Sequence, residues 1–230
     1  MTGGARRIGA AICEALAAEG AAVAIHCHRS VEEAQGVRGR CPGSVVVEAD
    51  LSERGGRLRL LAEATRALGP LDILVNNAAV YEKNPLAAVD DEAWDRTLAT
   101  NLKAPFFLAR DTGLAMKRAG SGAIVNLTDW AVARPYTDLL PYFAAKAGLE
   151  AMTLGLARAL APEVRVNAVA PGAILPAAGA GHAPEEEVAR ANLLGRWGGT
   201  GAVVSAVMFL ICNDFITGAV IPVDGGRPLR

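Results

Sequence analysis

The sequence has few of the features that mark membrane, nucleic-acid-binding or metal-binding proteins. No apolar run is long enough to span a membrane. Lys and Arg total 23 against 24 Asp and Glu, and no basic cluster provides the electrostatic footprint of nucleic-acid binding. The triplet His26-Cys27-His28 lacks a clear third ligand group, so we expect no bound metal. No C-x-x-C pair occurs, and we expect reduced structural thiols at Cys13, Cys27, Cys41 and Cys212.

No internal repeat, linker or signal segment interrupts the chain. A basic stretch followed by an apolar one, typical of secretion, is absent from its start, so we expect a cytoplasmic protein. Of the 230 residues, 52% are hydrophobic and 20% are charged. This composition favours one globular domain, residues 1–230, with a sizeable core.

Apolar runs alternate with helix-forming segments along the whole chain. We expect strands at residues 21–26, 44–49, 71–75, 123–127, 164–169 and 219–226. We expect helices at residues 10–20, 31–38, 56–68, 90–120, 142–160 and 202–212. The alternation predicts an α/β fold of the Rossmann type: a doubly wound, mainly seven-stranded parallel sheet with helices on both faces.

A glycine-containing turn at residues 2–9 precedes the first helix. Glycines there let the backbone approach a diphosphate at the positive helix N-terminus, but G-x-G-x-x-G is absent and an ordinary connection would look similar. Such a turn normally follows the central strand of the sheet, whereas only Met1 precedes it here. Two strand edges would then stay unpaired, so we expect about 5–8 residues of apolar strand upstream of Met1. Mass spectrometry of the native N-terminus would test this.

The residues after the strand at 21–26 favour a phosphorylated cofactor. Sites specific for NAD tend to place an acidic residue here to hold the ribose 2′-hydroxyl. This chain places Arg29 and Ser30 there, which suit the 2′-phosphate of NADP. The alternative is a solvated arginine and a helix N-cap serine, and Ser30 could serve in both roles.

Polar residues follow two further strands. Asp50 ends the strand at 44–49, where it could accept a hydrogen bond from an adenine amino group or cap a helix beginning near Ser52. Asn76 and Asn77 end the strand at 71–75. Their amides suit backbone bracing and cofactor contact, or simply an Asx turn.

Asn101 lies inside the helix expected at 90–120, where asparagine has no intrinsic advantage. Pro105, four residues later, lacks the N–H that would bond the Asn101 carbonyl. A free carbonyl could hold a water molecule, and a locally kinked helix is the alternative explanation.

Three ionisable side chains recur at a suggestive spacing near the strand at 123–127. Tyr142 and Lys146 are four residues apart, so on a helix they share one face. A lysine ammonium beside a phenol favours the phenolate, which predicts a lowered pKa for Tyr142. Asp129 closes the strand and could complete a proton-delivery relay with them. A bare Y-x-x-x-K is short, however, and an ordinary exposed helix would also show it.

The segment at residues 173–190 is rich in Ala, Gly and Pro, and we interpret it as a mobile lid over a site.

Taken together, these motifs resemble the short-chain dehydrogenase/reductase family over nearly the whole chain. The matching elements are Thr2-Gly3 to Gly9, Asp50, Asn76-Asn77-Ala78, Asn101, Tyr142 with Lys146, Pro171-Gly172 and Val223-Asp224-Gly225-Gly226. The resemblance implies an NADPH/NADP+ cofactor, a small-molecule substrate and a homotetramer. It implies cofactor contacts at Gly3, Arg7, Ile8, His28, Arg29, Ser30, Asp50, Leu51, Asn77, Ala78, Ala79, Tyr142, Lys146, Pro171 and Gly172.

Three departures are similar to the pteridine reductase branch, which includes bacterial dihydromonapterin reductases. Arg7 replaces the middle glycine of the turn, Asp129 replaces the catalytic serine, and residues 26–30 read His-Cys-His-Arg-Ser. In that branch the arginine faces the cofactor phosphate and the pterin, and Tyr81 matches an aromatic residue that sandwiches the pterin. Ala79 departs from the branch, which often has a serine contacting the substrate there. The implied substrate contacts are Arg7, Tyr81, Asp129 and Tyr142.

We therefore expect NADPH-dependent hydride transfer to a pterin C=N bond. In this interpretation Tyr142 passes the proton, Asp129 supplies it, Lys146 binds the nicotinamide ribose, and Asn101 holds a water of the proton chain. One alternative is a carbonyl reductase for acyl thioesters or small ketones, against which Asp129 argues. Another is a nucleotide-binding scaffold without turnover, against which the intact set of catalytic residues argues. The sequence leaves the pterin open: dihydromonapterin, dihydrobiopterin or dihydrofolate.

Overall fold

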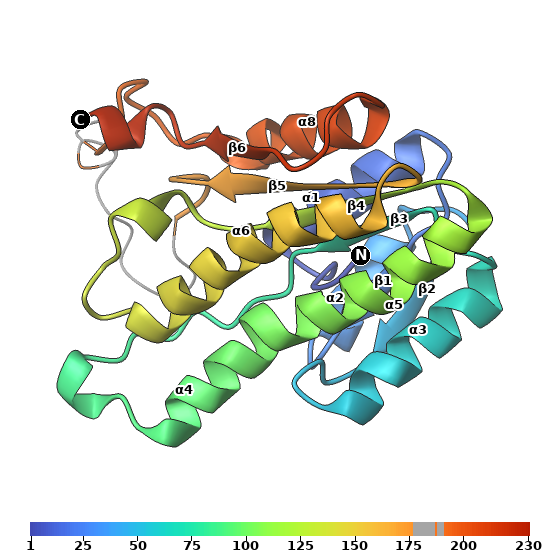
Figure 1. Cartoon of the computed structure of the whole chain (residues 1–230), viewed down its shortest axis with the longest axis horizontal. Coiled ribbons are helices and arrows are strands. Elements are labelled where there is room, and N and C mark those ends of the chain that lie inside the picture. Colours follow the sequence, from blue (N-terminus) through green and yellow to red (C-terminus); the bar gives the residue numbers. More distant parts are fainter. Residues whose placement is uncertain (177–186, 188–190) are drawn as a thin grey trace.

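The computed structural model describes residues 1–176, 187 and 191–230. It has the expected α/β architecture, with parallel strands covered by helices on both faces (Figure 1). The strands are β1 (Ala24–Cys27), β2 (Val45–Glu48), β3 (Ile73–Asn76), β4 (Gly122–Leu127), β5 (Val164–Pro171) and β6 (Val220–Val223). The α-helices are α1 (Arg7–Ala18), α2 (Val31–Arg38), α3 (Arg54–Leu68), α4 (Asp91–Leu98), α5 (Ala104–Ala119), α6 (Leu140–Leu160) and α8 (Gly199–Cys212). The Rossmann-type class predicted from the sequence is confirmed.

The strands form two parallel sheets, β1-β2 and β3-β4-β5-β6. Residues 1 and 2 connect them. The Met1 carbonyl accepts a hydrogen bond from the His26 N–H, and the Thr2 N–H donates to the Val75 carbonyl, both at 3.0 Å. Beside this connection a groove of about 320 Å³ separates the β1 edge from the β3 edge, with Leu16, Leu60 and Leu108 among its lining residues. The sheet is therefore continuous only near the carboxyl ends of the strands.

Two apolar cores fill the space between strands and helices. Alternate residues of a strand point to opposite faces, so neighbours on a fully covered strand belong to different cores. On β4, Val125 packs in the core beneath α1 and α8, whereas Ile124 packs in the core beneath α3, α5 and α6. Both side chains are fully buried. This pattern is why β4 is a continuous apolar run in the sequence.

The helix expected at 90–120 is divided into three parts. After α4 comes a π-helical turn, η2 (Ala99–Lys103), and then α5, which carries Pro105 in its first turn. Proline has no N–H for an α-helical bond to a preceding carbonyl, so the helix widens there. The segment is thus a widened turn between two α-helices, and the role of Asn101 in holding a water molecule stays a prediction.

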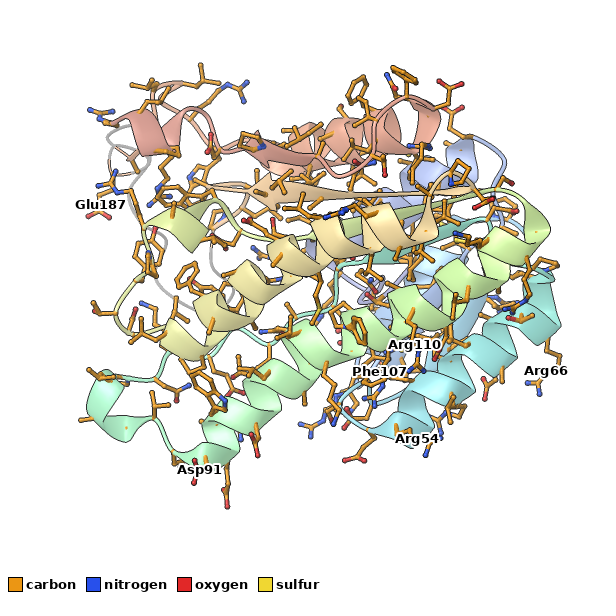
Figure 2. The ribbon with its side chains drawn as sticks, in the orientation of Figure 1. Arg54, Arg66, Asp91, Phe107, Arg110 and Glu187 are labelled. Atoms are coloured by element: carbon orange, nitrogen blue, oxygen red, sulfur yellow. The ribbon has the colours of Figure 1, made fainter. Side chains whose placement is uncertain are left out.

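Helix α5 packs against α3 through an aromatic ring held between two cations. Figure 2 labels Phe107 and Arg110 where α5 passes α3. The Arg110 guanidinium carbon lies 4.6 Å from the centroid of the Phe107 ring, and that of Arg57 lies 5.4 Å from it. Cation–π contacts of this kind add to apolar packing and fix how the two helices meet.

A buried amide network ties the sheet to α6. The Asn76 side-chain amide donates to Asn126 Oδ1 at 2.9 Å, and the Asn126 amide donates to Thr153 Oγ1 at 2.9 Å. Thr153 Oγ1 in turn donates to the Leu149 carbonyl within α6 at 2.8 Å. Buried polar groups are costly unless they are paired, so this network specifies how α6 sits on β4.

Replacement of Asn126 by alanine should therefore destabilise the fold. The change removes the 2.9 Å acceptor of the Asn76 amide, which keeps only its 3.3 Å contact with the Pro105 carbonyl, and it removes the donor to Thr153. We expect a loss of about 2–3 kcal/mol in the free energy of unfolding. Urea denaturation followed by circular dichroism measures this loss. Asn84→Ala is the matched control, because the Asn84 amide makes only a 3.4 Å contact with the Glu82 carbonyl in an exposed loop. Equal effects of the two changes would contradict the proposed importance of the network.

Candidate active site

The turn between Met1 and α1 is shaped to approach a ligand closely. Gly3 has φ of +61°, and a Cβ added there would lie 2.9 Å from the Ala78 Cα. A Cβ added at Gly9 would collide with the Gly3 carbonyl. Arg7 is the first residue of α1 and has φ of +54°, a strained value for a residue with a side chain. Its guanidinium donates to the Pro176 carbonyl at 2.8 Å.

His26 braces this turn from beneath. Its Nδ1 accepts a hydrogen bond from the Gly3 N–H at 3.0 Å, and its Nε2 lies 2.9 Å from the Ala49 carbonyl. Since Nδ1 accepts, Nε2 carries the proton and donates to Ala49. Burial lowers the pKa of His26 to about 4, so the ring is neutral. We considered His26 from the sequence only as a metal ligand, and its bracing role was missed.

Asn77 fixes the turn from the neighbouring strand. Its side-chain amide donates to the carbonyls of Thr2 and Gly3 at 3.1 and 3.0 Å. The Thr2 hydroxyl accepts from the N–H groups of Asn77 and Ala78 at 2.9 and 3.1 Å. Asn77 thus has the bracing role expected of it, whereas Asn76 lies in the buried network described above.

The ends of β1 and β2 lie side by side. His28 Nε2 lies 3.6 Å from Asp50 Oδ2, and Asp50 Oδ1 accepts from the Ser52 N–H and hydroxyl at 2.9 and 2.7 Å. The hydrogen bond from the Ser52 hydroxyl holds the pKa of Asp50 below its usual value. Helix α3 begins later, with Glu53 as its N-cap. The alternative role of Asp50 as a helix cap is therefore wrong.

Arg29 and Ser30 follow β1 at the same edge. The Arg29 side chain is exposed, and Ser30 occupies the N-cap position of α2 without a capping hydrogen bond from its hydroxyl. Neither side chain is thus used to cap α2. The other residues implied as cofactor contacts also lie at or beyond the carboxyl ends of strands or in the first turn of α1: Ile8, Leu51, Ala78, Ala79, Pro171 and Gly172.

Asp129 and Tyr142 form a partly buried hydrogen-bonded pair. The Tyr142 hydroxyl lies 3.1 Å from Asp129 Oδ2, while Asp129 Oδ1 accepts from the Ala131 N–H at 2.8 Å. Asp129 acts as the N-cap of a short 3₁₀ turn, η3 (Trp130–Ala133). One carboxylate oxygen thus anchors the side chain, and the other faces the phenol.

Lys146 lies one helical turn after Tyr142 on α6 and is buried. Its Nζ donates to the Leu127 carbonyl at 2.7 Å and lies 5.5 Å from the centroid of the Tyr142 ring. Burial lowers the pKa of Lys146 to about 8. The shared face predicted from the spacing is confirmed.

The predicted lowering of the Tyr142 pKa is wrong. Burial, the charge of Asp129 and the hydrogen bond to Asp129 raise the pKa of Tyr142 well above its usual value. Lys146 does not reverse this, because its ammonium is directed at the Leu127 carbonyl. Burial also raises the pKa of Asp129, and this effect is larger than the lowering by the hydrogen bonds from Ala131 and Tyr142. The pair therefore favours its protonated forms and is better suited to donating a proton than to removing one.

Asn101 holds the loop that carries Tyr81. Its side chain accepts from the Val80 N–H and donates to the Val80 carbonyl, both at 2.8 Å. The ring of Tyr81 lies 4.9 Å, centroid to centroid, from that of Tyr142 and meets it edge to face. The Tyr81 side chain is 54% exposed and so has a free surface beside the catalytic candidates.

Further aromatic residues continue from Tyr142. Phe143 contacts both Tyr142 and Tyr136, and Trp130 contacts Tyr136, with ring centroids 5.2, 5.7 and 6.3 Å apart. We missed this aromatic cluster in the sequence. A signal was present, because aromatic residues are only 5% of the chain and two of them lie between Asp129 and Tyr142.

Most of the segment interpreted as a lid, residues 177–186 and 188–190, lies outside the described residues. Within the part of the chain that the structure describes, no group of His, Cys, Asp and Glu could hold a metal ion. No helix in that part is long and apolar enough to cross a membrane.

The chain is similar to known reductases in sequence and in fold. Residues 3–227 match a family model described as enoyl-(acyl carrier protein) reductase. A 3-oxoacyl-[acyl-carrier-protein] reductase of Staphylococcus aureus is 33% identical over 98% of this chain and 96% of its own length. FolM alternative dihydrofolate reductase 1 from Brucella canis, solved with NADP, is 38% identical with a TM-score of 0.91, covering 100% of this chain and 92% of that one. The angucycline C-6 ketoreductase LanV with bound NADP is 31% identical with a TM-score of 0.90, covering 100% and 94%.

The neutral state of His26 predicts a pH-dependent stability. The pKa of His26 is about 4 in the folded protein and 6.5 in the unfolded chain, so the unfolded chain binds the proton first as the pH falls. Neutral His26 makes its full contribution to the free energy of unfolding above pH 6.5 and loses that contribution as the pH falls from 6.5 to about 4. We expect the contribution to be roughly 3 kcal/mol. Urea denaturation at several pH values measures it. His26→Phe should flatten this dependence, and an unchanged slope would contradict the assignment.

Proposed function

The chain belongs to the short-chain dehydrogenase/reductase family, and we propose that within it the protein reduces a C=N bond of a dihydropterin with NADPH. The family makes it an NAD(P)-dependent oxidoreductase. One observation carries the finer proposal: the carboxyl group of Asp129 is hydrogen-bonded to Tyr142 where the family as a whole has a serine. Similarity to the FolM structure supports the same choice.

The phosphate turn and the end of β1 fit NADP(H). Gly3 and Gly9 let the turn pack closely against Ala78 and against itself at the N-terminus of α1. The positive end of a helix is where a diphosphate would bind. Arg7 would approach the same phosphates. Arg29 and Ser30 would bind the 2′-phosphate, and Asp50 would accept a hydrogen bond from the adenine. Lys146 would bind the nicotinamide ribose. When bound, NADPH supplies the hydride.

The aspartate suits a C=N bond better than a carbonyl. Reducing a carbonyl forms an alkoxide, which neutral hydroxyl groups stabilise. Reducing a C=N bond adds hydride to carbon and requires a proton on the basic ring nitrogen. Tyr142, kept neutral by its raised pKa, donates that proton, and Asp129 returns one to the phenolate and is reprotonated from solvent. Asn101 would hold a water of this chain as well as the loop at Val80.

The surroundings of the pair suit a flat, polar ring system. Tyr81 stands edge to face against Tyr142 and leaves half of its surface exposed. An aromatic ring in that position can stack on a pterin. Arg7 lies across the phosphate turn and would contact the same ring.

Carbonyl reduction is the second candidate. The names of two similar proteins, the 3-oxoacyl reductase and the ketoreductase LanV, favour it, and Asp129 in place of serine argues against it. A scaffold without turnover is disfavoured, because Asp129, Tyr142, Lys146 and Asn101 are all present and the first three contact one another or the same strand end.

The relay predicts the effect of removing the carboxyl group. Asp129→Asn keeps the side-chain shape but cannot return a proton, so we expect kcat for a dihydropterin to fall about 100-fold or more. NADPH binding should stay within about twofold, because Asp129 contacts Tyr142 and Ala131 and the expected loss belongs to a transition-state interaction. Steady-state oxidation of NADPH measures the first and fluorescence titration the second.

Asp138→Asn is the matched control, because Asp138 lies in the same loop and pairs with Lys83 at 3.2 Å. It should retain turnover. Acetoacetyl thioester serves as the competing substrate for the wild type. Turnover of the thioester alone would overturn the pterin proposal, and full pterin turnover by Asp129→Asn would overturn the relay.

The direction of the Asp129 pKa shift predicts a pH profile. The active form of Asp129 is protonated, so kcat should be constant at low pH and fall as the pH rises through its pKa. Carboxyl groups ordinarily have a pKa of ~4. Burial raises the pKa of Asp129, so the decrease in kcat should occur at a higher pH than for an ordinary carboxyl group. The profile of kcat against pH with a dihydropterin measures it. A flat profile across that region would contradict Asp129 as the proton source.

A further inference from the structure

The C-terminal turn brings a cation to the aromatic cluster. After β6, Gly225 and Gly226 have φ of +66° and +76° and reverse the chain into the 3₁₀ turn η4 (Arg227–Leu229). The Arg227 guanidinium carbon then lies 4.5 Å from the centroid of the Trp130 ring. Trp130 directly follows Asp129, so Arg227 stands beside the candidate active site from a different part of the chain.

The charge of Arg227 acts on the groups that surround the site. It lowers the pKa of Asp129, of Tyr136 and of Tyr81, in each case against a larger upward effect of burial. A guanidinium that acts on all three lies near them as well as against the Trp130 ring. Arg227 is therefore close to the Asp129 and Tyr142 pair.

No acidic side chain neutralises this cation in the described ranges, 1–176, 187 and 191–230. None of the ion pairs formed there includes Arg227. Asp129 uses one oxygen for the Ala131 N–H and the other for Tyr142. The aromatic contact orders the guanidinium, which also makes a hydrogen bond to the Tyr136 side chain. A guanidinium has five N–H donors, so one hydrogen bond leaves enough of them to bind a carboxylate in a bidentate fashion.

We propose that Arg227 is a specificity residue that selects dihydropterins whose side chain carries a carboxylate over those whose side chain is neutral. The inference rests on the proposed function. The glutamyl group of dihydrofolate is a carboxylate of this kind, and the hydroxylated side chain of dihydrobiopterin is not. Arg7, the other arginine near the site, already donates to the Pro176 carbonyl, and under the proposed function it contacts the pterin ring rather than the side chain of the pterin.

The test compares dihydrofolate with dihydrobiopterin as substrates of the wild type and of Arg227→Gln. We expect kcat/KM for dihydrofolate to fall roughly 10- to 100-fold, the range for loss of a charge-assisted hydrogen bond. The fall should arise mainly in KM, because the carboxylate is remote from the reacting bond. For dihydrobiopterin we expect a change below about threefold, since that substrate lacks the anion. Arg227→Lys should recover part of the preference.

Arg134→Gln is the control, because Arg134 is exposed and follows the turn that carries Trp130. Among the described residues it donates only to the Arg230 carbonyl, at 3.3 Å. It should leave both substrates unaffected. A second measurement uses the wild type alone: raising the salt concentration should increase KM for dihydrofolate and leave that for dihydrobiopterin unchanged. This arm decides the question even if Arg227→Gln fails to fold.

The outcomes separate this inference from the proposed function. If the wild type reduces neither pterin, the proposed function fails and the inference fails with it. If the wild type reduces both but Arg227→Gln loses them equally, or only moves the pH profile of kcat, Arg227 acts through Asp129 and the specificity role is overturned while pterin reduction stands. Selective loss of dihydrofolate supports the proposal.

Discussion

The hydrogen bond between Tyr142 and Asp129 governs the chemistry of this site. Both groups are withdrawn from water, and a carboxyl beside a phenol disfavours ionisation of either. Lys146 is close, yet its ammonium is held by the Leu127 carbonyl. The usual logic of a lysine that activates a tyrosine is therefore weakened here. What remains is a neutral phenol hydrogen-bonded to a carboxyl group whose pKa is raised by burial. This arrangement favours delivery of a proton during reduction.

The remainder of the fold keeps that pair at the cofactor edge of the sheet. The Asn76, Asn126 and Thr153 network sets α6 on β4, and thereby sets Tyr142. His26 and Asn77 hold the phosphate turn against the same edge. These contacts are polar and buried, so each is costly if its partner moves. A Rossmann-type fold gathers its site from the ends of several strands, and here side-chain amides and one neutral imidazole fix those ends relative to one another.

Much of this arrangement could be predicted from local patterns. Strand positions follow from apolar runs, and the shared face of Tyr142 and Lys146 follows from their spacing. The direction of the Tyr142 pKa shift could not be predicted, because it depends on how deeply the phenol is buried and on its contact with Asp129. Arg227 was missed for a related reason: it reaches Trp130 only through the reversal at two glycines, nearly a hundred residues further along the chain. The π-helical turn near Pro105 was foreseen only as a kink, since sequence shows the missing donor but not how the helix adapts.

The buried amide network has a consequence for hydrogen exchange. Asn76, Asn126 and Thr153 join β3, β4 and α6 through side-chain hydrogen bonds inside the protein. Opening one of these elements alone would leave buried polar groups without partners, which is costly. The backbone amides of the three elements should therefore exchange with solvent as one cooperative unit.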